Sequence, residues 1–407
     1  MKHTANLTLA FLCLLCSCGG PMFDSQMDQY TGFKPVKSEI ILNHDFNAAN
    51  DSLFLYFKVE DVRQVMDLSE EVFRFDYAVR KGEGREAVTS AIKLLKRTTE
   101  QEAVYLTFAL PQESFSAGDA FQLRAWQTSE GQERVVLSEN ITLRKEMLQK
   151  DYLLTKAGTG KPLFQTYLNA SEQVVVVQED TSKTIELQHL NADFPPALPP
   201  MAVSQEQQVP RTLKITKKLH FSSGDTIRFE EPGLYLVNAS PGSATGILVR
   251  PEKFPLLTTA DELIQPLIYM TTSTERRALY NAADPKAAVD EFWLRTAKDK
   301  SIARELIRVF YSRVEAANKA FTSHKSGWAT DRGMIYIIFG QPDVVNQSGD
   351  VLTWTYRETN TSPYLKFVFN KKQNNFTENH YELVRRRDYE ESWYSTVAKW
   401  RAGVTDI

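Results

Sequence analysis

The most informative part of this sequence is residues 327–343, which read Gly327-Trp328-Ala329-Thr330-Asp331-Arg332-Gly333 and then Met334-Ile335-Tyr336-Ile337-Ile338-Phe339-Gly340-Gln341-Pro342-Asp343. Gly327 permits backbone conformations that other residues avoid, and Trp328 can bury a large apolar surface. Thr330 and Asp331 can accept hydrogen bonds from the backbone N–H groups of a turn. Arg332 is expected to pair with Asp331 or Asp343. We interpret the stretch as a turn that leads into a strand over residues 334–339.

Helices are expected before this turn. Asp284 followed by Pro285 is typical of an N-cap and a first helical position, and apolar residues then recur at helical spacing. A longer helix follows, in which apolar residues recur every three or four positions: Leu306, Phe310, Val314, Ala317 and Phe321. Strands are expected after the turn at 352–356 and in a hairpin of 364–370 and 376–384, before a last helix at 390–402. The pattern predicts an α+β domain over residues 255–407.

This part of the chain resembles the GWxTD-domain family of bacterial envelope proteins. The family's helix signature is matched by Phe310-Tyr311-Ser312-Arg313-Val314-Glu315-Ala316-Ala317-Asn318, its turn by Phe339-Gly340-Gln341-Pro342-Asp343 and its strand by Trp354-Thr355-Tyr356. The resemblance covers about residues 260–390, and it departs from the family pattern at Leu294-Arg295-Thr296. It implies an architecture for the C-terminal domain and no particular chemistry.

Two interpretations of the motif follow from its residue types. In the first, Gly327, Trp328, Thr330, Asp331 and Arg332 form a structural corner, in which Trp328 is a buried anchor. In the second, the same residues form a ligand site, since a Trp platform beside Asp and Arg suits a sugar or a peptide. A ligand site would line an open pocket, whereas a corner would be buried.

The preceding residues are predicted to form two β-sandwiches. Alternation of apolar and polar residues over several short segments, separated by glycine-containing turns, favours an immunoglobulin-like sandwich over residues 36–146. A second strand-rich stretch over residues 150–252 favours another. Its middle carries Phe194-Pro195-Pro196-Ala197-Leu198-Pro199-Pro200, which cannot be a central strand because each proline removes a ladder donor. This segment is expected to be a loop, either a spacer or a docking site.

The first residues have the layout of a bacterial lipoprotein signal. Lys2 and His3 precede an apolar run that is too short for a transmembrane helix, and the run ends Leu15-Cys16-Ser17-Cys18. This ending resembles a lipobox, which implies a signal peptide over residues 1–17, lipidation of Cys18 and a flexible tether over residues 18–35. Several acyl chains on Cys18 would anchor the protein stably in a membrane. The expected location is the periplasmic face of the outer membrane, with exposure on the cell surface as an alternative.

Composition excludes several classes of function. All three cysteines lie at or before Cys18, so a disulfide, a catalytic thiol and a cysteine-ligated zinc are excluded for the mature chain. The remaining histidines are scattered in sequence, and we expect neither a metal site nor a cofactor. A net charge of −3 with interspersed signs offers no attraction for nucleic acid. The run Arg385-Arg386-Arg387 is interpreted as a solvated strand end, or as a contact for anionic lipid or an acidic partner.

Two hypotheses on function follow. The favoured one is a non-enzymatic envelope scaffold, in which two sandwiches and a GWxTD domain on a lipid anchor bind other envelope proteins. The rival is a hydrolase or binder of envelope glycan or peptide, with its site near Trp328 and Asp331.

Overall fold

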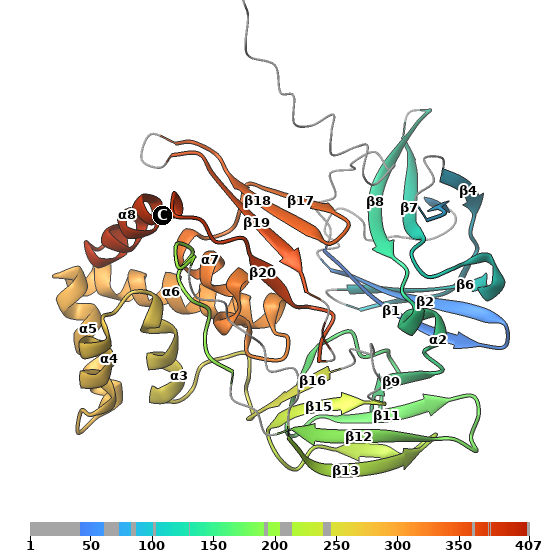
Figure 1. Ribbon diagram of the computed structural model, residues 1–407, viewed down its shortest axis with the longest axis horizontal. Coiled ribbons are helices and arrows are strands. Elements are labelled where there is room, and N and C mark those ends of the chain that lie inside the picture. The colour runs from blue at the N-terminus through green and yellow to red at the C-terminus, as the bar shows by residue number, and fades with distance from the viewer. Residues whose placement is uncertain are drawn as a thin grey trace, which may run out of the picture.

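The chain folds into a β-sheet-rich N-terminal region and a mixed α/β C-terminal part (Figure 1). The computed structural model describes residues 41–404, apart from 61–72, 83–86, 101–102, 130, 191–193, 204–213, 239–245, 360–362, 373 and 375. The predicted signal peptide, Cys18 and the tether lie outside the described residues. Within the described ranges, no helix is long and apolar enough to cross a membrane.

The first β part consists of two four-stranded sheets with antiparallel pairs throughout. One sheet has the order β1 (Ile41–Ala49), β2 (Ser52–Glu60), β6 (Ala103–Pro111), β5 (Leu94–Thr99), and the other has the order β4 (Ala87–Ala91), β3 (Phe73–Arg80), β7 (Ala120–Ser129), β8 (Gln132–Thr142). Residues of β2 alternate between buried and half-buried, because successive side chains of a strand point to opposite faces. The inward side chains of both sheets form one apolar core. A short helix, α2 (Lys145–Gln149), leads to the second β part.

The second β part has a five-stranded and a three-stranded sheet. The order of the larger is β10 (Tyr167–Asn169), β16 (Gly246–Arg250), β15 (Gly233–Val237), β12 (Thr184–Leu190), β13 (Ile215–Ser222), and that of the smaller is β14 (Thr226–Arg228), β11 (Gln173–Gln178), β9 (Tyr152–Lys156). The β10–β16 pair is parallel. The sequence does not mark β9 by alternation, because its first four residues are all buried and the strand has no wet face there.

The helices before the motif begin at recognisable caps. Capping boxes at Thr259 and Thr272 start α3 (Ala260–Ile264) and α4 (Ser273–Tyr280), and the 3₁₀ helix η3 (Gln265–Tyr269) lies between them. The predicted cap at Asp284 is confirmed, since its side chain accepts from Ala287 N at the start of α5 (Pro285–Ala297). The long helix α6 (Lys300–Phe321) buries the predicted apolar stripe against the C-terminal core.

Two predictions for the region after α6 were wrong. The predicted strand at 334–339 is part of a helix, α7 (Asp331–Phe339), because Thr330 caps a helix start and the apolar run is buried on nearly every side. The second strand of the predicted hairpin starts later than 376, as β20 (Tyr381–Leu383). The sheet order is β17 (Val344–Ser348), β18 (Val351–Tyr356), β19 (Leu365–Lys371), β20, and α8 (Tyr389–Arg401) closes the chain.

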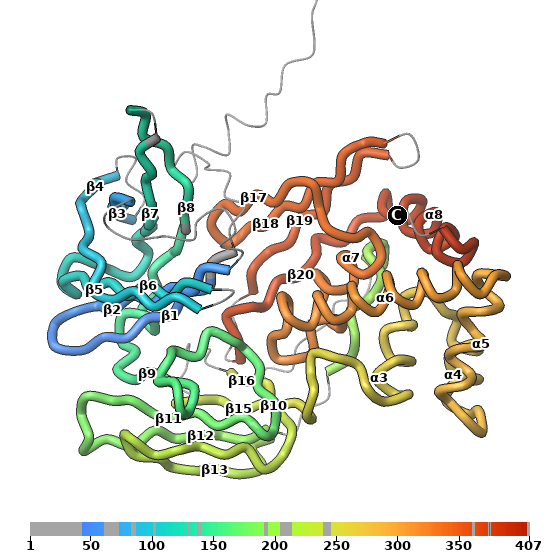
Figure 2. The backbone as a smooth tube through the Cα atoms, turned by 180° about the vertical axis from the view of Figure 1, so that it is seen from behind, coloured from blue at the N-terminus to red at the C-terminus, as the bar shows by residue number. Residues whose placement is uncertain are grey.

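Residues 194–203, here called the strap, cross from the second β part to the C-terminal part. The strap belongs to the connection between β12 and β13, and it lies among the helices of the C-terminal part (the green segment near α7 in Figures 1 and 2). Ala197 is a member of the C-terminal core cluster, and Met201 packs against that cluster. The core of the C-terminal part therefore includes residues that lie outside the predicted domain of 255–407.

Candidate functional site

Two glycines of the motif allow three backbone segments to come into direct contact. A Cβ atom on Gly327 would lie 1.9 Å from the carbonyl oxygen of Ala317 in α6. A Cβ atom on Gly333 would lie 1.9 Å from the carbonyl oxygen of Gly327 itself. Both positions therefore require glycine because of space, whereas the sequence suggested only an unusual backbone conformation at Gly327. The motif begins with a 3₁₀ turn, η4 (Gly327–Ala329), wedged against the end of α6.

Thr330 is the N-cap of α7. Its hydroxyl accepts from Gly333 N at 3.0 Å and donates to the carbonyl oxygen of Gly327 at 2.8 Å. The side chain thus satisfies an N–H group that a helix start leaves without a partner. Thr330 is buried, at 6% exposure, so its hydroxyl serves the fold locally.

Asp331 forms a buried ion pair with a residue that lies far along the sequence. Its two carboxylate oxygens accept from the guanidinium of Arg385 at 2.6 and 3.1 Å, and one of them also accepts from Leu383 N at 2.7 Å. The Arg385 side chain is 12% exposed. The prediction of a solvated Arg385 was wrong, whereas Arg386 and Arg387 are exposed. Asp331 thereby fixes the end of β20 to the start of α7.

Arg332 does not pair with Asp331 or Asp343, as the sequence suggested. Its guanidinium donates to the backbone and side-chain oxygens of Asn379 at 3.0 and 2.5 Å. It also lies over the ring of Tyr381, 4.3 Å from the ring centre. Burial lowers the pKa of Arg332 to about 10, although the group stays charged near neutral pH.

Trp328 is half-buried, packs its side chain against the C-terminal core and is also held through its backbone. Its N–H group donates to the side-chain oxygen of Asn318 in α6 at 3.0 Å, and its carbonyl oxygen accepts from the Tyr269 hydroxyl at 3.0 Å. The rings of Trp328 and Tyr269 meet edge to face, with 6.2 Å between their centres. Part of the indole remains accessible, so Trp328 is the most exposed of the five motif residues singled out from the sequence.

Two histidines meet beside the motif, which sequence spacing did not suggest. The rings of His324 and His380 lie 4.8 Å apart between centres, and Phe194 of the strap lies 4.5 Å from His324. Burial lowers the pKa of His324 to about 2 and that of His380 to about 4, so both rings are neutral near neutral pH. Among the described residues, no three histidine, cysteine or acidic side chains are grouped so that they could hold a metal ion.

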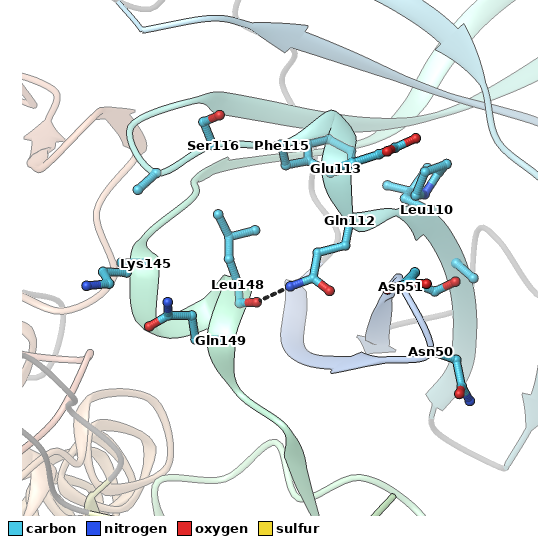
Figure 3. Close-up of a pocket in the computed structure, with 14 residues that line it drawn as sticks. Asn50, Asp51, Leu110, Gln112, Glu113, Phe115, Ser116, Lys145, Leu148 and Gln149 are labelled. Carbon is cyan, nitrogen blue, oxygen red and sulfur yellow. Dashed lines mark hydrogen bonds between the residues drawn. The ribbon is translucent and has the colours of Figure 1, made fainter.

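A separate hollow of about 960 Å³ lies on the first β part, away from the motif. It is formed by the β1–β2 turn, the 3₁₀ helix η2 (Gln112–Ser114) with its flanking residues, and α2, and Figure 3 shows polar and apolar side chains lining it. Gln112 lines the hollow and donates to the carbonyl oxygen of Leu148 at 2.7 Å. Sequence reasoning did not find this hollow because its walls come from three separate segments.

Comparison with known families agrees with the geometry of the C-terminal part. The family model of the GWxTD domain matches residues 233–402. The C-terminal part is a GWxTD domain. Its match begins at Gly233 in β15, before the start that the change from strands to helices suggested at 255. No curated protein matches the chain.

Proposed function

We propose that this protein is a lipid-anchored scaffold of the bacterial cell envelope that binds other envelope proteins and catalyses no reaction. The N-terminal sequence supports the anchor, since the residues before Cys18 have the order of a lipoprotein signal. The proposed location is the periplasmic face of the outer membrane. We infer neither a cofactor nor a nucleic-acid partner.

The observation that carries the proposal is that the polar groups of the motif are engaged by the chain itself. Both carboxylate oxygens of Asp331 bind Arg385, and the Thr330 hydroxyl both donates and accepts within its own turn. The Arg332 guanidinium is buried between Asn379 and two aromatic rings. A catalytic acid, base or nucleophile has to reach a substrate atom, and this arrangement favours a structural corner.

The form of the first β part supports a role in protein binding. Lettered in chain order, with β4 as C′, its sheets have the orders A-B-E-D and C′-C-F-G, which is the division of strands in immunoglobulin-like domains. We propose that this part is an immunoglobulin-like module. Such modules occur in many cell-surface proteins. The second β part, with its parallel β10–β16 pair, is a less regular sandwich.

Contacts between the parts favour one rigid body over freely jointed domains. The first β part meets the GWxTD domain through an ion pair between Arg144 and Glu378. The second β part meets it through the Thr166 hydroxyl, which donates to the carbonyl oxygen of Thr322 at 2.7 Å. A rigid body of this kind would hold its binding faces at fixed distances, as a scaffold requires.

Purification from membranes tests the proposal. The tagged full chain, solubilised in detergent, should carry envelope proteins in fixed ratio, and it should release no product from peptidoglycan or unstructured peptides. Cys18→Ala serves as the control for location, because it should leave the membrane fraction or retain its signal.

The rival function keeps one point in its favour, the partly accessible indole of Trp328. A hydrolase or a glycan or peptide binder with its site near Trp328 and Asp331 would release a product or retain a ligand. Loss of that property in Asp331→Asn, with thermal unfolding unchanged, would replace the scaffold proposal with the rival.

A further inference from the structure

The strap is far longer than its place in the β-sheet requires. Strands β12 and β13 are antiparallel neighbours, and Leu190 lies opposite Ile215 at the end of their ladder. Such neighbours are ordinarily joined by about 2–5 residues, whereas residues 191–214 join them here. Connections longer than about 12–15 residues without secondary structure of their own are usually either functional or linkers. The extra length takes the chain to the GWxTD motif.

The strap binds the GWxTD domain through hydrogen bonds that an extended peptide would make. The N–H group of Ala197 donates to the carbonyl oxygen of Ala329, inside the motif, at 2.9 Å. The carbonyl oxygens of Pro195 and Leu198 accept from Lys325 Nζ at 2.8 Å and from Arg385 Nη2 at 3.1 Å. The pattern therefore pairs backbone groups of the strap with groups of one face of the domain.

The chemistry of the strap matches that face. Four prolines within residues 195–200 remove N–H groups from the strap and leave its carbonyl oxygens as acceptors. The opposing face offers mainly donors, namely Lys325 Nζ, Arg385 Nη2 and Arg386 N, the last of which donates to Pro200 O at 3.1 Å. Proline also holds the chain extended, so that little conformational freedom is lost on binding.

Two side chains of the strap would give the face its selectivity. Phe194 is 8% exposed and packs edge to face against His324. Ala197 is 4% exposed and belongs to the apolar core beneath the motif, so a large side chain would not fit there. Along the strap, the aromatic residue Phe194 is followed by two prolines and then by the small residue Ala197.

We propose that this face of the GWxTD domain, formed around Lys325, Ala329 and Arg385, is a binding groove for extended proline-containing peptides, and that the strap fills it as an intramolecular ligand. The partner that fits is a proline-containing segment of another protein, with an aromatic residue three positions before a small one. The strap competes with it, because a tethered ligand acts at an effective concentration in the millimolar range. The proposal does not depend on the lipid anchor or on the absence of catalysis.

The proposal is tested with a variant of the full chain in which the strap no longer fills the groove. Residues 194–201 are replaced by a glycine-serine segment of equal length, and a fluorescent synthetic peptide of residues 193–202 is titrated by anisotropy. The variant should bind the peptide, and the wild type should bind it at least about tenfold more weakly because its own strap competes. Binding should also raise the thermal midpoint of the variant.

Two controls define the specificity. The same peptide carrying Ala197→Trp should bind at least about tenfold more weakly, since the buried position leaves no room for an indole. The emptied protein carrying Lys325→Met, which loses the donor to Pro195, should bind the unaltered peptide about tenfold more weakly. Equal binding of both peptides would show that the interaction is nonspecific and would overturn the proposal.

The result remains decisive if the emptied variant does not fold. The peptide is then added during refolding, and recovery of the circular dichroism signal supports the groove, whereas no recovery overturns it. A folded variant that binds no peptide also overturns the proposal. A wild-type dimer formed by exchange of straps, detected by size-exclusion chromatography, would assign the groove to a second copy of this chain and not to another protein.

Discussion

Replacing Asp331 with alanine should destabilise the GWxTD domain by about 3 kcal/mol. The change removes both acceptors of the Arg385 guanidinium and the acceptor of Leu383 N. Loss of one partner of a buried ion pair costs about 3–5 kcal/mol, because the remaining charge stays buried without compensation. We expect a cost at the lower end of this range, because Arg385 is 12% exposed and keeps its hydrogen bond to the carbonyl oxygen of Leu198.

Tryptophan fluorescence in urea measures this loss selectively. Trp126 lies in the first β part, and the other tryptophans of the chain lie in the GWxTD domain, so the signal reports chiefly on that domain. A loss of about 3 kcal/mol should lower the unfolding midpoint by about 1–2 M urea. Arg386→Ala is the matched control, because that side chain is 58% exposed and a surface substitution changes stability by about 0.5 kcal/mol or less.

A double variant separates the ion pair from other effects. Removing Asp331 and Arg385 together should cost less than the sum of the single losses, since no buried charge is then left without a partner. Unfolding of Asp331→Ala and Arg386→Ala at the same urea concentration would show that the ion pair does not stabilise the domain. In that case the carboxylate would be free for a ligand, and Thr330, Asp331 and Arg332 would be the first residues to test for binding.

Three further predictions concern acid, packing and the anchor. The pKa values of His324 and His380 lie below the ordinary value near 6.5, so the unfolded chain binds protons that the folded chain does not. The contribution of both histidines to the free energy of unfolding should be complete above about pH 6.5. It should fall toward pH 4 by about 1.4 kcal/mol per pH unit for each histidine. In His324→Phe, the thermal midpoint should therefore decline less steeply as the pH is lowered. Gly333→Ala should cost about 3 kcal/mol in a urea titration, at the upper end for overpacking, because its Cβ would meet a carbonyl oxygen at 1.9 Å. An alkyne fatty acid should label the wild type and not Cys18→Ala, and equal labelling of both would contradict lipidation.

The helices were predictable because their signals are local. The cap at Asp284 and the first helical proline lie beside each other in the sequence, and the apolar stripe of α6 repeats along one helix face. Strands such as β2 were predictable for a similar reason, since alternation along a single strand reports which face is buried, whereas the largely exposed strands β4 and β5 were not predicted. Each of these signals is complete within one element.

The errors at residues 334–339 and at β9 lie where burial on every side removes such a signal. The apolar run over residues 334–339 shows no period, so its length and residue types suggested a strand. Its helical state depends on the Thr330 cap and on contacts with α6 and β20, which no local pattern reveals. Strand β9 was missed for the same reason. His324 and His380 lie more than fifty residues apart in the sequence and meet only through the fold, so a single sequence does not indicate that their rings are neighbours.

The motif contains both kinds of residue, those explained by local contacts and those explained by contacts far along the sequence. Gly327, Thr330 and Gly333 are explained by atoms within the motif and the end of α6, which is why a turn could be inferred from the sequence. Asp331 and the strap depend on residues that lie far apart in the sequence, and Arg385 joins them, because its guanidinium binds the Asp331 carboxylate and the carbonyl oxygen of Leu198 at once. Asp331→Ala should loosen the end of β20, whereas the strap keeps its hydrogen bonds to Arg385, to Lys325 and to two backbone groups of the domain. Peptide binding by the otherwise unaltered chain should stay as weak in Asp331→Ala as in the wild type, so that loss of the ion pair lowers the stability of the corner without emptying the groove.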